Sequence, residues 1–442
     1  MYSAPALASA VVRPRRDEFL TGILGVCVRP VQAMLCEPSL VFLGAMTVML
    51  FRPPDYRFHS YDRFAFVLLV VIVLMRCVTL RERISLDDSI KWPMFGMVIL
   101  ATASALSEPY DPETWSVLAS KWIVPISLFW IAGYVFRDAR SLKRLERFSL
   151  LTLAYLVFIS IAFLLGAKQL VFPRYILDES FGIHADRARG PFLQAVANGV
   201  TLNLLGLLAL DSFRRRRLLG VPAILLLAPL PLAIVATKTR AVWLSFGASI
   251  VALLFLSANQ RLRRTCTALL LAGVAGLALL LCGCDHQHSL SQRLEETSQV
   301  KFRMAVYQAG WNMFLERPWL GWNRKAMQAE LANQVSDFHQ EEFYFHNTYL
   351  EILVQYGVVG LALYAWIVGK LLRVGRRNVS SVYEGGFLDG EFRSLWPILL
   401  GVYLVNSSFV VMNYQFVNGM IFSLGGMLSA QNRSRMRVCN AV

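Results

Sequence analysis

Long apolar runs recur from residue 31 almost to the C-terminus, and short polar or basic segments separate them. Each run is about 17–25 residues long, the length that an α-helix needs to cross the roughly 30 Å hydrocarbon core of a bilayer. The pattern therefore predicts about twelve membrane-spanning helices. They lie near residues 31–51, 64–80, 92–107, 116–136, 148–166, 192–211, 218–236, 241–258, 266–282, 347–370, 394–412 and 414–430.

Lysine and arginine gather in every second loop between these predicted spans, and in the C-terminal tail. Cytoplasmic loops of membrane proteins carry such an excess, so the basic loops and both termini are predicted to be cytoplasmic. The remaining segments are then external. They are residues 52–63, 108–115, 167–191, 237–240 and 283–346.

This alternation divides the chain into five parts. An amphipathic stretch at residues 17–30 is broken by Arg29 and Pro30 and is expected to lie at the inner interface. The predicted parts are a cytoplasmic or interfacial segment (1–30), nine transmembrane helices (31–282), a large periplasmic loop or cap (283–346), three further transmembrane helices (347–430) and a cytoplasmic tail (431–442).

The cap shows two helical patterns. Apolar residues recur at helical spacing in LSQRLEETSQVKFRMAVYQAGWNMFLERP, and this helix should end at Pro318. Trp319, Gly321 and Trp322 indicate a turn, and a second helical pattern begins at Lys325. The predicted fold class is therefore an all-α polytopic membrane protein with a mostly helical cap.

Composition supports this class. Of the 442 residues, 56% are hydrophobic and 17% are charged, whereas soluble chains carry about 25% charged residues. A β-barrel would need short alternating segments instead. The net charge of +15 is explained by the basic loops, so we expect no binding of nucleic acid. No small-residue cleavage site follows the basic N-terminal stretch, so we expect no cleavable signal peptide.

Basic residues in external loops oppose the usual charge bias and therefore need an explanation. Arg187 and Arg189 come just before a predicted span, and Lys238 and Arg240 occupy a very short external turn. Ionisable groups near the hydrocarbon boundary are costly and are usually functional or paired. Guanidinium groups can grip phosphate oxygens in a bidentate manner, so cations from separate loops could bind a pyrophosphate. Alternatively, these side chains extend to lipid headgroups.

His346 stands at the start of the predicted span 347–370. A neutral imidazole can act as a general base near pH 7, but it could instead bond a headgroup or a loop carbonyl. The other cap histidines are His286 and His288 beside Asp285, and His339 close to two glutamates. They form no ligand set of structural spacing, so we expect no metal and no cofactor. Gly357 and Gly360 are expected to allow close helix packing.

Four motifs, which follow the same order along the chain as in one known family, carry a resemblance to that family. HNTYLEILVQYGVVG at 346–360 resembles the His-Asn/Ser/Gln-x9-Gly-x-x-Gly signature of O-antigen ligases. RARG at 187–190 resembles the family's Arg-x-x-Gly, and TKTRAVWLS at 237–245 resembles its Thr-x-Ser/Thr-Arg turn. KFRMAVYQAGWNMFLERPWLGW at 301–322 resembles its Arg…Trp…Pro-x-x-Gly stretch. Together with the spans, the resemblance covers nearly the whole chain.

The resemblance implies a GT-C-like enzyme of the bacterial inner membrane, with its active site on the periplasmic face. It would transfer a polysaccharide from undecaprenyl diphosphate to lipid A-core, among membrane lipids. His346 would be the catalytic base, and Arg187 or Arg189, together with Arg240, would bind the diphosphate. A single displacement predicts inversion, and cations at the leaving group make a metal unnecessary. Possible supporting residues are Lys238, Arg303, His339, Tyr344 and Asn347.

Three alternatives stay open. O-antigen polymerases and protein O-oligosaccharyltransferases share the same signature region. The non-enzymatic alternative is a secondary transporter, since many of these have about twelve spans and place their sites near the bilayer midplane. In this sequence the unusual residues gather at one outer face instead, which favours the enzyme.

Overall fold

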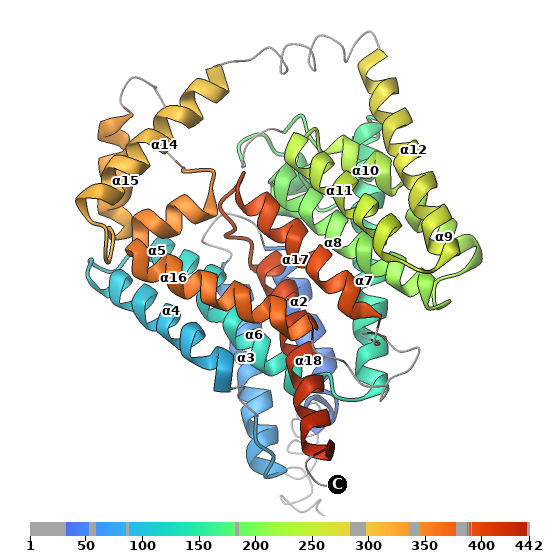
Figure 1. Cartoon of the computed structure of the whole chain (residues 1–442), viewed down its shortest axis with the longest axis horizontal. Coiled ribbons are helices and arrows are strands. Elements are labelled where there is room, and N and C mark those ends of the chain that lie inside the picture. The colour runs from blue at the N-terminus through green and yellow to red at the C-terminus, as the bar shows by residue number, and fades with distance from the viewer. Residues whose placement is uncertain are drawn as a thin grey trace, which may run out of the picture.

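The computed structural model describes residues 32–52, 59–84, 88–181, 185–282, 298–335, 344–376, 387, 389 and 391–439. Over these residues the chain forms helices joined by turns, with no strand (Figure 1). The predicted all-α class is therefore confirmed. The amphipathic stretch 17–30, the histidines at 286, 288 and 339, and the first part of the cap lie outside the described residues.

The helices follow one another with short connections. In the first half these are α2 (Pro38–Leu50), α3 (His59–Thr79), α4 (Asp88–Leu106), α5 (Pro112–Leu118), the π-helical turn η2 (Ala119–Ile123), α6 (Val124–Val135), α7 (Ala139–Leu164), the 3₁₀ turns η3 (Lys168–Leu170), η4 (Arg174–Leu177) and η5 (Gly190–Phe192), and α8 (Ala195–Arg214). In the second half they are α9 (Gly220–Leu227), α10 (Leu230–Ala236), α11 (Arg240–Leu256), α12 (Gln260–Cys282), α14 (Ser298–Glu316), α15 (Arg324–Gln334), α16 (Thr348–Arg376), α17 (Phe392–Ser407) and α18 (Gln415–Cys439).

Each of the predicted spans overlaps one of these helices or two consecutive ones. Among the described residues, 5 helical stretches are long and apolar enough to cross a membrane: Ser89–Leu106, Pro112–Val135, Ala139–Leu164, Ala195–Arg214 and Thr348–Gly375. Shorter apolar helices cover Pro38–Leu50, Gly220–Ala236 and Arg240–Leu256. The chain is thus a multi-pass helical membrane protein, whereas the number of spans, their orientation and the GT-C-like arrangement stay predictions.

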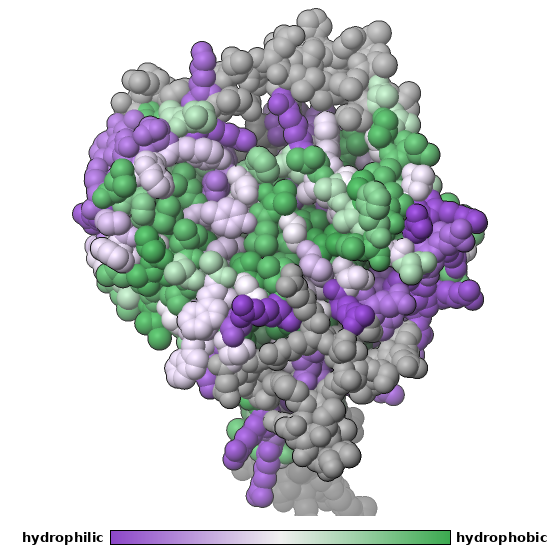
Figure 2. Space-filling model, in the orientation of Figure 1, coloured by the Kyte–Doolittle hydropathy of each residue, from purple (hydrophilic) through white to green (hydrophobic). Residues whose placement is uncertain are grey.

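Helix α8 lies at the centre of the bundle, since nearly all of its side chains are buried. Its polar residues bond to neighbouring helices. For example, Ser249 of α11 donates to the Asn203 side chain at 3.1 Å, and Asn198 donates to the Ser160 hydroxyl of α7 at 3.2 Å. On the surface, hydrophobic residues cross the middle of the molecule and hydrophilic residues gather above and below them (Figure 2). This is the distribution that a membrane-spanning bundle requires.

The cap consists of α14 and α15 in its described part, as the sequence predicted. Val306, Ala309 and Met313 of α14 form a small core with Met327 and Leu331 of α15. Two carboxylates, one on the α4–α5 connection and one in the first turn of α5, hold α15 in place. Glu108 accepts the backbone N–H of Lys325 at 2.8 Å, and Arg324 bonds Glu113 at 2.7 Å. The end of the bundle beside α14 and α15 is called the cap end below (Figure 1).

Helix α16 is broken at Gly357, where the backbone has φ 63° and ψ −165°. The turn that joins α14 to α15 fills the break. The N–H groups of Val358 and Val359 donate to Pro318 and Trp319 at 2.8 and 3.4 Å, and Trp322 N–H donates to Val354 at 2.9 Å. A Cβ atom on Gly357 would lie 2.2 Å from the Trp319 oxygen. The close packing expected at Gly357 is therefore observed, but it occurs at a break in the helix, which admits another backbone.

Candidate functional site

The segment that carries Arg187 lies against the turn that carries Lys238. The backbone N–H of Ala188 donates to the Ala236 carbonyl at 3.1 Å, and the Lys238 amine lies 3.9 Å from the Asp186 carboxylate. Arg240 follows as the first residue of α11 and is exposed. The predicted convergence of these two loops is therefore observed, and it places several cations at the cap end of α8, α10 and α11.

The Arg-x-x-Gly motif has a local structural explanation. Gly190 has a positive φ of 58°, and a Cβ atom there would lie 2.5 Å from the Asn198 side-chain oxygen. Asn198 in turn donates to the carbonyl of Ala188 at 2.9 Å. Glycine is required because it alone combines this backbone conformation with such a close approach. The motif thus fixes the path of the chain directly after Arg187.

Arg189 is bound differently from Arg187. Its side chain is fully buried, and its guanidinium donates to the carbonyls of Ile176 at 2.9 Å, Phe181 at 2.5 Å and Asp178. These carbonyls belong to the connection between α7 and α8. The side chain therefore holds that connection in place, and its complete burial keeps it away from a ligand at the surface.

His346 stands two residues before α16 in a left-handed conformation, with φ 51°. The Asn347 side chain then accepts the N–H groups of Tyr349 at 2.9 Å and Leu350 at 3.2 Å, so it caps the helix. The pKa of His346 is lowered from 6.5, first by burial and second by the positive charge of Arg303 on α14. The imidazole is therefore neutral at pH 7, the form that can accept a proton.

The first turn of α16 is fixed from several sides. The Thr348 hydroxyl donates to the Val410 carbonyl at 2.7 Å and accepts the Met412 N–H at 3.0 Å. The Tyr349 hydroxyl donates to the Leu404 carbonyl at 2.7 Å. These contacts tie the residues that follow His346 to α17 and to the α17–α18 connection. They limit the positions that the imidazole can take.

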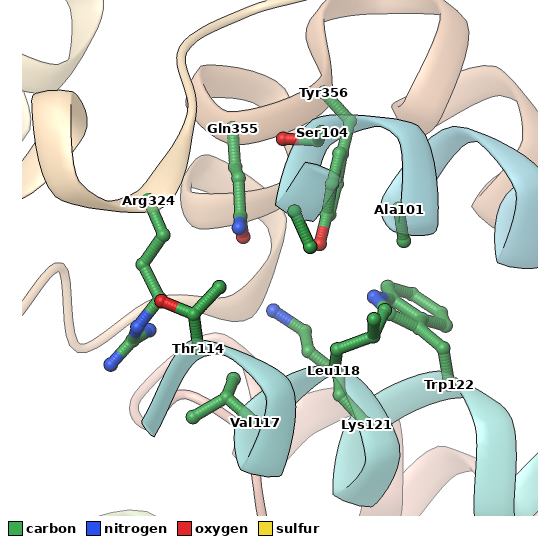
Figure 3. Close-up of a pocket in the computed structure, with 11 residues that line it drawn as sticks. Ala101, Ser104, Thr114, Val117, Leu118, Lys121, Trp122, Arg324, Gln355 and Tyr356 are labelled. Carbon is green, nitrogen blue, oxygen red and sulfur yellow. The ribbon is translucent and has the colours of Figure 1, made fainter. Parts of the chain in front are cut away.

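A buried ion pair between Glu351 and Lys121 completes this anchoring. Lys121 lies on the π-helical turn η2, and both side chains are about 95% buried, with 4% and 5% of their surface exposed. Figure 3 shows the Lys121 amine and the Gln355 amide pointing toward the same small space, with Arg324 of the cap beside them. That space is about 10 Å³, close to the least that one water molecule requires. The cluster therefore connects α16 to both the bundle and the cap.

Tyr414 links the His346 segment to the loop that carries Arg187. It forms a side-chain hydrogen bond with Gln194, and its ring centre lies 6.5 Å from that of Phe192. Tyr344, two residues before His346, acts electrostatically on Tyr414. Since Phe192 and Gln194 follow Arg189 closely, the imidazole and the cationic loops lie around one region of the cap end.

Backbone strain gathers in the same region. Within the described part of the chain, the residues other than glycine with positive φ are Arg81, Leu193, Arg216, Lys238 and His346. Leu193, Lys238 and His346 belong to the three loops just described. Such conformations cost about 1–3 kcal/mol each and cluster at sites where geometry matters for function.

The structure thus places the Arg187 segment beside the turn that carries Lys238 and Arg240, and it places Arg303 close to the His346 imidazole. His339 lies outside the described residues. Sequence reasoning missed Lys121, Glu351, Gln194 and Tyr414. A lysine and a glutamate inside apolar runs were the available signal for the ion pair, because buried charges need partners.

Fold and site together define a polytopic helical membrane protein with a histidine and several cations at one end of the bundle. Residues 222–365 match the family model described as O-antigen ligase. This match agrees with the resemblance drawn from the motifs, and the matched stretch includes Lys238, Arg240, Arg303, Tyr344, His346 and Asn347. None of the curated proteins matches the chain.

Proposed function

We propose that this protein is an O-antigen ligase. In this proposal it transfers a polysaccharide from undecaprenyl diphosphate to a sugar hydroxyl of lipid A-core in the bacterial inner membrane. The observation that carries the proposal is a histidine fixed at the capped start of α16, in a bundle whose cap end also carries Arg187, Lys238 and Arg240, while residues 222–365 match the O-antigen ligase family. The family match supports a glycosyltransferase, and the identities of donor and acceptor are part of the proposal.

The cationic loops would bind the diphosphate of the donor. Arg187, Lys238 and Arg240 present cations from the loop before α8 and from the α10–α11 turn. Between the two candidates of the Arg-x-x-Gly motif we choose Arg187, because Arg189 bonds three backbone carbonyls. As the glycosidic bond breaks, negative charge develops on the departing diphosphate. Fixed cations stabilise that charge more in the transition state than in the bound donor.

His346 would be the general base. The acceptor hydroxyl attacks the anomeric carbon, the bond from that carbon to the diphosphate oxygen breaks, and the hydroxyl proton passes to the imidazole. Undecaprenyl diphosphate leaves, and a single displacement inverts the anomeric configuration. Asn347, Thr348 and the Lys121–Glu351 pair are positioning residues, since they fix the turn that follows the imidazole.

The proposal is tested with purified protein, undecaprenyl-diphosphate-linked glycan and lipid A-core. His346→Ala should lower the rate of lipopolysaccharide formation by about 10²–10⁴-fold, the usual contribution of a general base. Gln308→Ala, an exposed change on α14, is the control and should retain the full rate. Wild-type ligation that persists in chelator agrees with a reaction that needs no divalent metal. Full activity of His346→Ala would refute the base assignment.

The acceptor decides between ligase and polymerase. The same assay is run with a lipid-linked single repeat in place of lipid A-core. Longer lipid-linked glycan with no product on lipid A-core would identify a polymerase and contradict the proposal. Transfer to a peptide acceptor would identify a protein O-oligosaccharyltransferase, and uptake of a solute without any transfer would identify a transporter.

A further inference from the structure

Helix α14 of the cap has two apolar faces. One face carries Val306, Ala309 and Met313, which form the core with α15. The other carries Trp311 and Leu315, which lie one helical turn apart and are 49% and 59% exposed. A cap helix surrounded by water would normally place polar residues on that second face.

The turn after α14 continues the exposed apolar surface. Trp319 and Leu320 are 71% and 64% exposed, although their backbone is locked into the break of α16. The neighbouring residues of α16, Val358 and Val359, are 42% and 38% exposed. They begin the part of α16 that follows the break, and α16 as a whole is long and apolar enough to cross a membrane. The side chains of the turn are therefore continuous with a surface that faces lipid.

The level of this surface along the bundle is fixed by the α4–α5 connection. Leu106 ends α4, another membrane-length helix, and is 67% exposed. Two residues later Glu108 accepts the Lys325 N–H of α15 at 2.8 Å, so the cap turn lies beside the end of α4. In Figure 1 the lower end of α14 reaches this level, and the helix slants away from it toward its N-terminus.

We propose that Trp311, Leu315, Trp319 and Leu320 insert into the lipid interface at the cap end of the bundle. The occupant of this surface is the boundary between headgroups and acyl chains of the surrounding bilayer. Tryptophan is enriched at this depth, where one part of the ring meets hydrocarbon and the indole N–H meets water. In sequence, Arg317 lies between Leu315 and Trp319. Its guanidinium stacks over the Trp322 ring at 4.1 Å, which keeps a cation at headgroup level.

This arrangement makes the cap a membrane-bound element on the side of α4 and α16. Its polar α15 face, which includes exposed Asn333, stays in water. A lipid-linked substrate approaching within the bilayer would then meet α14 and the cap turn on this side. The lipid contact itself does not depend on the proposed ligase activity.

Photo-crosslinking in the full-length protein tests the inference. Benzoyl-phenylalanine is placed at 311, 315, 319 or 320, and at 333 as the matched exposed control on α15. The protein is reconstituted in vesicles of phosphatidylethanolamine and phosphatidylglycerol, illuminated and analysed by mass spectrometry. We expect lipid adducts at the four apolar positions to exceed those at 333 by about tenfold, because these side chains would sit in the acyl-chain boundary rather than in water.

Equal lipid labelling at 333 and at the four positions would overturn the inference, as would crosslinked dimers in place of lipid adducts. A second measurement retains the native side chains. Phospholipid brominated near the headgroup should quench wild-type tryptophan fluorescence more strongly than that of the double variant Trp311→Phe, Trp319→Phe. Identical fractional quenching of the two proteins would contradict the lipid contact, whatever the result of the glycan-transfer assay.

Discussion

Cations at the two ends of α8 differ in their contacts with carboxylates. At its last turn, Arg214 contacts Asp211, Asp389 and Glu391 at 2.7, 2.6 and 2.8 Å. Arg215 contacts Glu146 at 2.7 Å and Asp211 at 2.9 Å. Each arginine is thus held by several short contacts to carboxylates from α7, α8 and the segment before α17.

At the opposite end, a cation meets a carboxylate at a longer distance. Lys238 lies 3.9 Å from Asp186, whose side chain is 47% exposed. Arg189 is the exception, because three carbonyls bind it, and it therefore resembles the arginines at the far end of the helix. The difference suggests a way to distinguish cations that stabilise the fold from cations that bind a ligand. An arginine with several short contacts to carboxylates stabilises the fold, whereas an anionic ligand can replace an exposed carboxylate that lies at a longer distance.

The largest expected effect is on stability, at the end of α8 with the carboxylates. Arg215→Met should destabilise the protein by about 3–5 kcal/mol, because buried carboxylates lose their partner. The measurement is the temperature at which the protein in detergent loses its folded state. Arg264→Met, which removes an exposed charge on α12, is the control. Equal melting temperatures of the two variants would show that the charge network contributes little.

The next largest effect concerns the two neighbouring arginines before α8, Arg187 and Arg189, which are expected to affect donor binding and stability respectively. Arg187→Gln should raise KM for the lipid-linked donor roughly tenfold to a hundredfold, since one charge-assisted hydrogen bond contributes about 1.5–3 kcal/mol. Its melting temperature should change little. Arg189→Gln should instead lower stability by about 1–3 kcal/mol through unsatisfied buried carbonyls. The opposite pattern would assign the diphosphate to Arg189 and remove the distinction between the two residues.

The smallest effect concerns pH. Burial and then Arg303 lower the pKa of His346 below 6.5, so the activity of the wild type should fall only when the pH drops through that lower value. Arg303→Gln removes the positive charge, which raises the pKa toward 6.5 and moves the acidic limb of the kcat/KM profile to higher pH. Lys301→Gln, two residues earlier on the same helix and exposed, is the control. A profile that does not move, or moves to lower pH, would contradict the electrostatic role of Arg303.

Much of the fold could be predicted from the sequence because membrane helices require long apolar runs. Helices overlap all the predicted spans, and the cap helices begin and end close to the expected positions at Pro318 and Lys325. The charge bias assigned the loops that carry Arg187 and Arg240 to one side of the membrane, but only the structure shows that the two loops are neighbours. The number of spans and their orientation stay predictions.

Other features depend on contacts between residues far apart in sequence, which periodicity does not reveal. Gly357 fits a helical pattern, but the carbonyls that occupy the break come from Pro318 and Trp319. Arg187 fits the spacing of the Arg-x-x-Gly motif, but Arg189 stayed open as the alternative, and the path of the α7–α8 connection shows that Arg189 is held by backbone carbonyls. The sequence suggests that Lys121 and Glu351 each need a partner of opposite charge. That they pair with each other depends on how η2 packs against α16, which the sequence does not show.

The break in α16 has a consequence for biogenesis. The N–H groups of Val358 and Val359 need carbonyl partners, and the partners lie on the turn at 318–319. A backbone group without a partner is costly in hydrocarbon, so the span that follows Gly357 is complete only when this turn is already in place. The turn precedes the span along the chain and leaves the ribosome first. The order of synthesis therefore delivers the turn before the helix segment that depends on it, and we expect the cap to assemble before α16 settles in the membrane.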